Sequence, residues 1–332
     1  MSPSGHLRFL LEPLVIHNHI PKTGGNAMRQ LLKANYGPRE LIHVSRPPEV
    51  QGETLLEPAD LVARTTAWRD WYSSLEPEDK KKLRCLSGHE APFLMQVITD
   101  RPLHPFCMLR DPVDFVISAF LFAVWRGDHF GRHGPGVSMV RQVREQGGGL
   151  KDVYRELGGG RQSSSERSPA ADDFLSGFFN WQTRHILLGT VKPGDIPFEA
   201  DPDALREYRD MAFETLKTSY VVGTQDRFSQ SVRLFAATFG WRSVFVPRAN
   251  VGGLRGREEE LGIDDETRSE IRRYNQVDAA LHAHYSQRLA DLPPTGRLTD
   301  LNGRARRHVA RARMTFLGRT SRIRRAPLLR RP

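Results

Sequence analysis

The chain is poor in cysteine and has no long apolar segment. It has 332 residues but only two cysteines, Cys85 and Cys107, which excludes the disulfide framework of small secreted domains. Both lie in apolar, strand-like surroundings, so we expect them to be buried and reduced. No apolar run is long enough to span a bilayer, and Glu12 and Pro13 interrupt the apolar opening of the chain. We therefore expect a cytoplasmic protein.

Acidic residues are absent from the last thirty positions. Residues 303–332 contain eleven arginines, no lysine and no acidic side chain, whereas the whole chain has a net charge of +10. Subtracting the eleven arginines leaves about −1 for the rest, so the basic character belongs to this segment. We expect a single domain over residues 1–300 and a disordered arginine-rich tail over residues 301–332. Such tails bind nucleic acid, anionic polysaccharides or membrane surfaces, and a peripheral membrane location stays open.

The most informative stretch is residues 14–34, LVIHNHIPKTGGNAMRQLLKA. A short apolar run leads into Pro-Lys-Thr-Gly-Gly, and apolar residues with helical spacing follow, which predicts strand, turn and helix. Adjacent glycines let backbone amides approach a ligand, and the helix directs the positive end of its dipole to the same place. With the ammonium of Lys22 and the hydroxyl of Thr23, this segment predicts a phosphate or other oxyanion site. The lysine precedes the glycines, unlike in the standard nucleoside-triphosphate loop. An ordinary connection with a solvated lysine is the alternative.

A second motif lies in residues 105–124, PFCMLRDPVDFVISAFLFAV. A buried strand over residues 106–109 ends at Arg110, and an apolar helix follows, with Asp111 as its N-cap and Pro112 in its first turn. Ser118 is the only polar side chain in the middle of that helix. Arg110 and Ser118 can therefore converge on a second phosphate. A structural ion pair and a hydroxyl bonded to its own helix are the alternatives.

A histidine follows a third strand, in Arg-Cys-Leu-Ser-Gly-His-Glu at residues 84–90. Ligands of open α/β sheets bind at the carboxyl ends of the strands, and His89 would stand at such an end. Histidine accepts protons near neutral pH, so we interpret His89 as a general base, with a structural histidine as the alternative. Glu90 is either a second base or the residue that orients His89, and it is also a candidate for contact with the acceptor.

Together these motifs resemble the sulfotransferases that use 3′-phosphoadenosine 5′-phosphosulfate (PAPS), closest to the carbohydrate branch with heparan sulfate 2-O-sulfotransferase and its bacterial relatives. The resemblance covers residues 14–285 and implies an α/β fold like that of P-loop NTPases, with a mostly parallel sheet flanked by helices. The family usually continues Gly-Gly-Thr-Ser, whereas this chain continues with Asn26 and Ala27. The residues implied to hold the 5′-phosphosulfate are Lys22, Thr23, Gly24, Gly25 and Asn26, and those implied to hold the 3′-phosphate are Arg110 and Ser118.

The resemblance also implies roles further along the chain. Similar Asn-x-Gln-Thr-Arg segments in bacterial members make Gln182 and Arg184 candidates for contact with the acceptor or the cofactor. Arg255 and Arg257 lie where relatives wrap the adenine and the 3′-phosphate. We expect no metal, since His129 and His133 lack the partner ligands that a metal would need.

Hydrophobic spacing predicts the remaining elements. Helices are expected over residues 59–72, 77–83, 203–219 and 228–240, one helix from Asp173 to Ile186, and one or two over residues 264–288. Residues 220–224 form a further strand, and Asp226 is the expected N-cap of the helix after it.

Two hypotheses follow. The first is a PAPS-dependent sulfotransferase acting on a hydroxyl of a carbohydrate or glycoconjugate, with His89 as base and Lys22 at the leaving phosphate. The second is a non-catalytic binding protein of the same fold that acts through its arginine tail on nucleic acid or an anionic membrane surface. The joint presence of Lys22, His89, Arg110 and Ser118 favours the enzyme.

Overall fold

The computed structural model describes residues 11–44, 58–130, 145, 147–152, 154, 178–188, 190–191, 195–197, 201–244, 258 and 262–292. The predicted tail over residues 301–332 lies outside these residues, as do the cofactor candidates Arg255 and Arg257.

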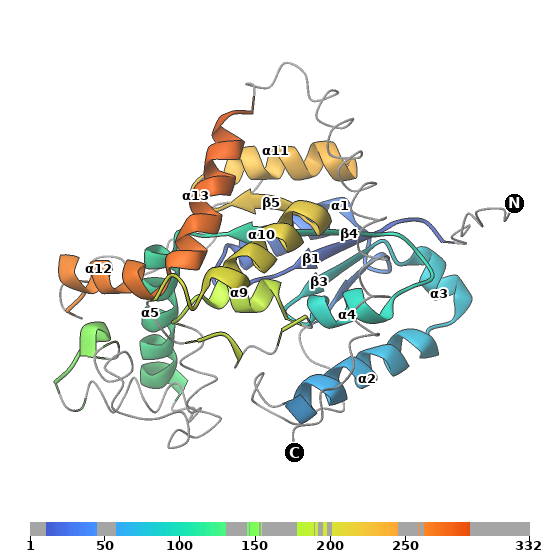
Figure 1. Ribbon diagram of the computed structural model, residues 1–332. Helices are drawn as coiled ribbons and strands as arrows, with labels where there is room; N and C mark the ends of the chain where they lie inside the picture. The colour runs from blue at the N-terminus through green and yellow to red at the C-terminus, as the bar shows by residue number, and fades with distance from the viewer. Residues whose placement is uncertain are drawn as a thin grey trace, which may run out of the picture.

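The centre of the fold is a five-stranded sheet in which every pairing is parallel (Figure 1). The strand order is β2-β3-β1-β4-β5, so β1 lies in the middle between β3 and β4. Parallel strands covered on both faces are apolar throughout, and the first strand is buried along its whole length. The predicted α/β class with a parallel sheet is confirmed. The strands are β1 (Leu14–Asn18), β2 (Leu41–His43), β3 (Cys85–Gly88), β4 (Leu103–Leu109) and β5 (Val221–Thr224).

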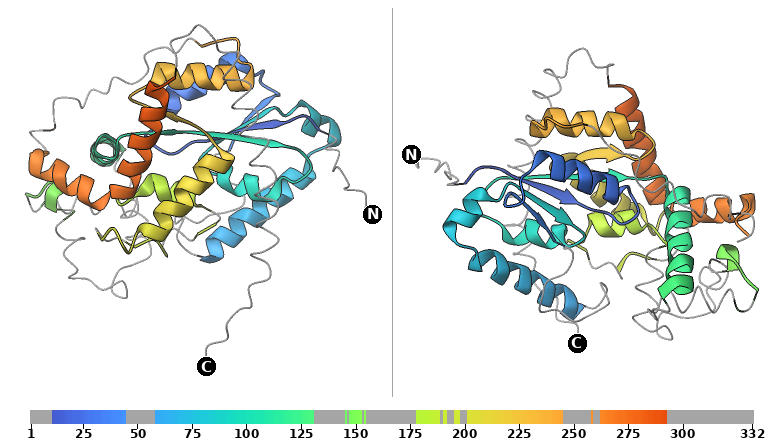
Figure 2. Two further views of the ribbon diagram at one scale, coloured as in Figure 1. Left: turned by 45° about the horizontal axis from the view of Figure 1, so that its top comes forward. Right: turned by 180° about the vertical axis from the view of Figure 1, so that it is seen from behind.

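Two helices cover one face of the sheet, α1 (Gly25–Asn35) and α11 (Phe228–Phe239), as Figures 1 and 2 show. Both are amphipathic, with the apolar side chains of α1 at Met28, Leu31 and Leu32 turned to the sheet. These pack with Phe106 of β4 and Phe235 of α11 in one apolar cluster. The cluster fixes α1, and therefore the loop that precedes it, against the centre of the sheet.

The opposite face carries α4 (Ala91–Val97), with α2 (Pro58–Ser74) packed on its outer side (Figure 1). Beyond β4 and β5, a second large apolar cluster joins the C-terminal helices to the long helix that follows β4. The remaining helices are α3 (Pro77–Lys82), α5 (Pro112–Phe130), α9 (Trp181–Ile186), α10 (Arg206–Ser219), α12 (Asp265–Tyr274) and α13 (Gln276–Ala290).

Several local predictions are confirmed. Cys85 on β3 and Cys107 on β4 are free and buried, with β1 between their strands, and burial raises the pKa of both thiols. The carboxylate of Asp111 accepts hydrogen bonds from the amides of Val113 and Asp114, as expected of an N-cap. In the described part of the chain, none of the helices has the length and apolar character needed to cross a membrane.

Two predictions are wrong. The helix expected from Asp173 to Ile186 is not continuous, because Asn180 has a left-handed backbone (φ 49°) and α9 starts only at Trp181. Asp226 is not the N-cap of α11: the cap position is Arg227, and no side chain bonds to the first turn. The carboxylate of Asp226 is bonded instead to side chains of α13, a partner some sixty positions later in the chain.

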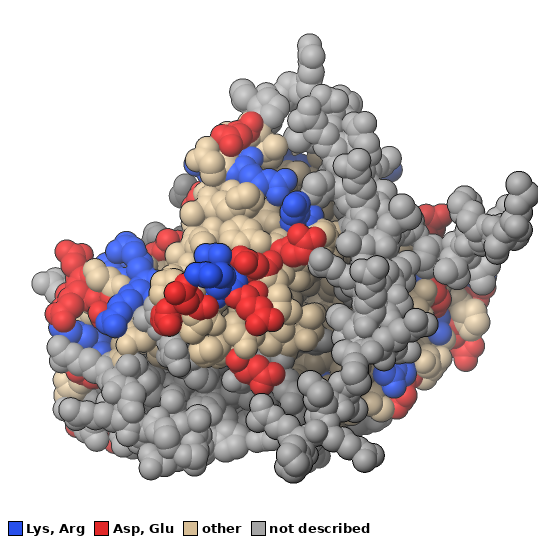
Figure 3. Space-filling model, viewed as in Figure 1, with Lys and Arg blue, Asp and Glu red and all other residues tan. Residues whose placement is uncertain are grey.

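Charged side chains are mixed over the face seen in Figure 3, where lysine and arginine lie next to aspartate and glutamate. On α10 and the turn before it, Arg206 pairs with Asp203, and Arg209 pairs with Asp210. Neither sign dominates this face, in agreement with the near-neutral charge calculated for the chain without its tail.

Candidate active site

The candidate site lies where the parallel strands end. The carboxyl ends of β1, β3 and β4 stand side by side, and each is followed directly by polar residues: His19, His89 and Arg110. In open α/β sheets, ligands bind at this edge where the chain connections diverge to opposite sides. Here that position lies between β1 and β4, because the chain leaves β1 toward β2 on one side and leaves β4 toward β5 on the other.

The loop after β1 is built to present backbone amides. Lys22 and Gly24 both have positive φ angles (65° and 97°), which turn the chain sharply before α1. The hydroxyl of Thr23 is buried and donates to the carbonyl of Ile20 (2.7 Å), so its proton closes the loop and an anion would meet the backbone amide of Thr23 instead. Helix α1 has no side-chain cap at Gly24. Its first-turn amides are therefore available to an anion.

Two cations lie together beside this loop. The guanidinium of Arg110 donates through Nη1 to the carbonyl of Lys22 (3.0 Å). Burial, and then the charge of Arg110, lower the pKa of Lys22 to about 8, and no carboxylate of the described residues opposes these effects. Two cations that lie close together repel each other, and a bound anion offsets this repulsion. The pair therefore favours a ligand with several negative charges.

Ser118 belongs to the same neighbourhood. The Lys22 ammonium lies 4.1 Å from the centre of the Phe122 ring, which is 40% exposed. Phe122 is four positions after Ser118 on α5, so the two side chains occupy one face of the helix. The half-buried Ser118 is thus turned to the side of the loop, as its predicted role requires.

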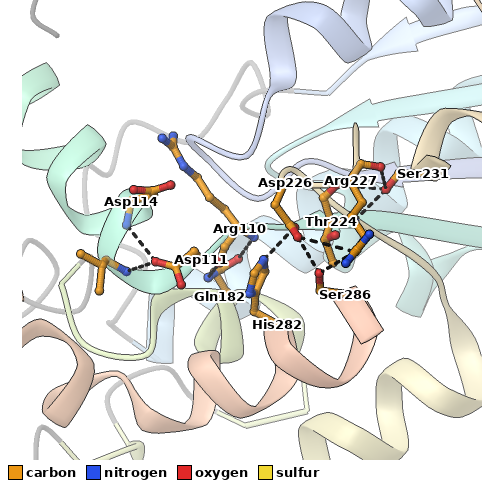
Figure 4. A network of polar contacts seen from close by, with 11 residues as sticks. Arg110, Asp111, Asp114, Gln182, Thr224, Asp226, Arg227, Ser231, His282 and Ser286 are labelled. Carbon is orange, nitrogen blue, oxygen red and sulfur yellow. Dashed lines mark hydrogen bonds and ion pairs between the residues drawn. The ribbon is translucent and has the colours of Figure 1, made fainter. Parts of the chain in front are cut away.

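Arg110 is held in place by a residue far away in sequence. The side-chain oxygen of Gln182 accepts from the amide of Arg110, and its nitrogen donates to the carbonyl of Arg110, both at 2.8 Å (Figure 4). Gln182 is fully buried, so these bonds are shielded from water. We predicted contact of Gln182 with acceptor or cofactor; the geometry makes it a clamp on the backbone of a cofactor candidate.

His89 is presented as a base. Its Nδ1 lies 2.7 Å from the carbonyl of His19, and since a carbonyl only accepts, Nδ1 carries the proton. The neutral ring then has its lone pair on Nε2. Burial lowers the pKa of His89, the hydrogen bond to His19 raises it in part, and the charge of Arg29 lowers it again. The ring is therefore unprotonated and ready to accept a proton at neutral pH.

A stack of histidines connects His89, the candidate base, to the loop at residues 19–25, the candidate anion loop. The ring of His19 lies 4.4 Å from that of His89 and 5.4 Å from that of His17, nearly parallel to both. Its edge covers Gly25, where an added Cβ would lie 1.8 Å from Nε2 of His19. The imidazole of His19 therefore suffices to explain a glycine at this position. Sequence analysis missed His19, although its position one residue after a strand end was a usable signal.

Two predicted acceptor residues have structural partners. The carboxylate of Glu90 is 5% exposed and accepts from Arg64 (2.5 Å) and from the indole of Trp68 (3.3 Å), both on α2. The guanidinium of Arg184 is fully buried and donates to the carbonyls of Phe179 and Pro197. These contacts favour a structural interpretation of Glu90 and Arg184 over the predicted contact with an acceptor.

A buried network fixes the start of α9. Asp278 accepts from the amides of Gln182 (3.0 Å) and Thr183 (2.9 Å), and Asn180 accepts from the amide of Asp278 (3.2 Å). Burial raises the pKa of Asp278, although the hydrogen bonds from Thr183 and Gln182 lower it in part. Sequence analysis missed this network because its partners are almost a hundred positions apart. It holds Gln182 against Arg110.

A second polar cluster closes the end of β5. Asp226 accepts from His282 Nε2 (2.9 Å) and from the hydroxyl of Ser286 (2.5 Å), and Arg227 donates to Ser286 (Figure 4). Burial tends to raise the pKa of Asp226, but the hydrogen bonds from Ser286 and His282 help to bring it down to about 2. The cluster anchors α13 to the edge of the sheet beside Arg110.

Among the described residues, no three histidine, cysteine, aspartate or glutamate side chains are arranged to hold a metal ion. Comparison of the chain with models of protein families gives no match, and comparison with curated proteins gives none either.

Proposed function

We propose that the protein is a sulfotransferase that moves the sulfuryl group of PAPS to a hydroxyl of a carbohydrate or glycoconjugate, on a P-loop-like α/β fold. The observation that carries the proposal is the position of His89. Its proton-accepting nitrogen is fixed by the hydrogen bond to His19, and its ring is separated from Gly25 of the anion loop only by the ring of His19. A base and an anion site are therefore within one substrate's length.

The donor would be held at two places. Lys22 and the first-turn amides of α1 suit the 5′-phosphosulfate, since both are sources of positive charge and Lys22 comes only three residues before the helix. Arg110 and Ser118 suit the 3′-phosphate, because a guanidinium and a hydroxyl both donate to phosphate oxygens. Asn26 is exposed at the start of α1, where its amide replaces the hydroxyl that the family usually has.

The chemical step follows from these positions. As the acceptor oxygen forms its bond to sulfur, its proton passes to Nε2 of His89. The bond between sulfur and the 5′-phosphate oxygen breaks, and the ammonium of Lys22 stabilises the negative charge left on that oxygen. The products are a sulfate ester and 3′-phosphoadenosine 5′-phosphate. No metal is needed in this scheme, and a cytoplasmic location stays part of the proposal.

Binding of the product nucleotide tests the donor site. 3′-Phosphoadenosine 5′-phosphate should raise the melting temperature in a dose-dependent way, and AMP, which lacks the 3′-phosphate, should raise it much less. Equal shifts would remove the 3′-phosphate role of Arg110 and Ser118, and no shift with either nucleotide would contradict the donor site. Mass spectrometry of cell extract incubated with the protein and labelled PAPS would then identify the acceptor.

A further inference from the structure

His185 is a buried histidine that the chemical step above does not use. Its side chain belongs to α9 and the residue is only 1% exposed. Neither ring nitrogen has a hydrogen-bond partner among the described residues. Buried polar groups are nearly always paired with protein or with an ordered water, so an imidazole without a protein partner indicates a ligand or a water.

The ring of His185 faces the proposed base. The ring centres of His185 and His89 are 6.5 Å apart, with the planes nearly perpendicular (84°). Since a hydrogen bond to a ring nitrogen measures about 2.8 Å, one oxygen atom bonded to both rings fits this separation.

The position of His185 is rigid. The ring of Trp181, one turn earlier on α9, lies 6.0 Å from it, and the start of the helix is held by Asp278. Burial, followed by the charge of His89, lowers the pKa of His185 to about 3. At neutral pH the ring is therefore neutral, with one N–H to donate and one lone pair.

We propose that His185 and His89 hold a single oxygen atom between them, a water in the free protein and the acceptor hydroxyl in the reacting complex. The N–H of His185 donates to a lone pair of that oxygen, and the O–H is turned toward Nε2 of His89, which accepts the proton. The second lone pair of the oxygen stays free to form the bond to sulfur. His185 is then an acceptor-binding residue, and this part of the inference rests on the proposed function.

High-resolution crystal structures of the free wild-type protein and of His185→Phe test the first half. Wild type should show an oxygen within hydrogen-bond distance of both rings, and the Phe variant should lack it. Phe removes both nitrogens but keeps a planar ring, so the fold should survive. Wild-type density without an oxygen between the two rings would overturn the inference. This result does not depend on whether the protein transfers sulfuryl groups.

Kinetics test the second half, with water as the acceptor and release of 3′-phosphoadenosine 5′-phosphate from PAPS as the readout. His185→Phe should lower kcat about tenfold, the size of one lost hydrogen bond, without changing nucleotide affinity. His185→Gln, which can still donate, should recover most of the rate, and His284→Phe on the exposed side of α13 is the control.

A Phe variant at the wild-type rate, or a Gln variant as slow as Phe, would overturn the role of His185. Wild-type protein that neither binds the nucleotide nor releases it would contradict the proposed function instead, while the crystallographic result would stand.

Discussion

At the scale of single residues, the candidate site depends on where protons lie. His89 is neutral with its lone pair on Nε2, because the carbonyl of His19 fixes the proton on Nδ1. Lys22 is a cation whose charge is weakened by burial and by Arg110. Displacement by a hydroxyl group requires a neutral base that accepts the proton of the hydroxyl. It also requires a positive charge that stabilises the leaving anion.

Replacement of His89 tests the base. His89→Ala should lower turnover by roughly 10²–10⁴-fold, the usual contribution of a general base, with nearly unchanged nucleotide affinity. The rate of product nucleotide formation at saturating PAPS is the measurement, and calorimetry gives the affinity. His284→Ala, which removes an exposed imidazole, should leave both at wild-type values. Wild-type turnover in His89→Ala would end the assignment.

The lowered pKa of Lys22 predicts a pH dependence of nucleotide binding. The ammonium form binds the anion, and with a pKa of about 8 in the free protein this form is lost as pH rises through 8. Affinity for 3′-phosphoadenosine 5′-phosphate should therefore be constant near pH 7 and fall between pH 8 and pH 10. Lys22→Met should bind more weakly at pH 7 and lose this fall. A wild-type affinity that stays level to pH 10 would show that Lys22 does not meet the ligand.

At the scale of elements, the local signals of the sequence were sufficient for much of the fold. The strands and helices at residues 14–34 and 105–124 were predicted because hydrophobic spacing, a proline in the first turn and an aspartate cap act within a few residues. The start of α9 could not be predicted this way. Asn180 leaves the helical conformation because Asp278 and its neighbours bind it from a helix almost a hundred positions later.

The same limit applies to the site. Lys22, Arg110 and His89 were predicted as site residues because each comes after a strand, and strand ends are readable from the sequence. The roles of Gln182 and His185 depend on how α9 is docked, which no local pattern encodes. Sequence analysis therefore identified Gln182 as a candidate but assigned it a ligand contact, whereas it clamps the backbone of Arg110.

Loss of this clamp should weaken the 3′-phosphate site selectively. Gln182→Ala leaves the buried amide and carbonyl of Arg110 without their partners, so affinity for 3′-phosphoadenosine 5′-phosphate should fall about tenfold. Affinity for AMP should change much less, because Gln182 bonds to the backbone of Arg110, whereas the amides before α1 that would hold the 5′-phosphate belong to another segment. Gln287→Ala is the matched control, since among the described residues that side chain bonds only to exposed Asp291. Equal losses for both nucleotides would indicate general unfolding of the site, which a melting curve would reveal.

At the scale of the whole molecule, the buried histidines couple the site to stability. Burial lowers the pKa of His17 and of His185 to about 3, and lowers that of His19 even more strongly. All three imidazoles are buried near the carboxyl end of β1, and burial disfavours their protonated forms. The free energy of unfolding therefore depends on pH through the same residues that surround the proposed base.

Acid should destabilise the protein before its carboxylates titrate. Between pH 6.5 and 3 the unfolded chain binds protons on these histidines and the native protein does not, so stability is complete above pH 6.5 and falls as pH decreases. Each such histidine contributes a slope of about 1.4 kcal/mol per pH unit well below 6.5. Urea unfolding at pH 7, 6 and 5 measures the effect.

In His185→Phe the free energy of unfolding should fall less steeply with decreasing pH than in wild type, because the unfolded variant has one imidazole fewer to protonate. The exposed control His284→Phe should change the slope less. An unchanged slope in His185→Phe would mean that this imidazole is reached by solvent and protonates in the folded protein.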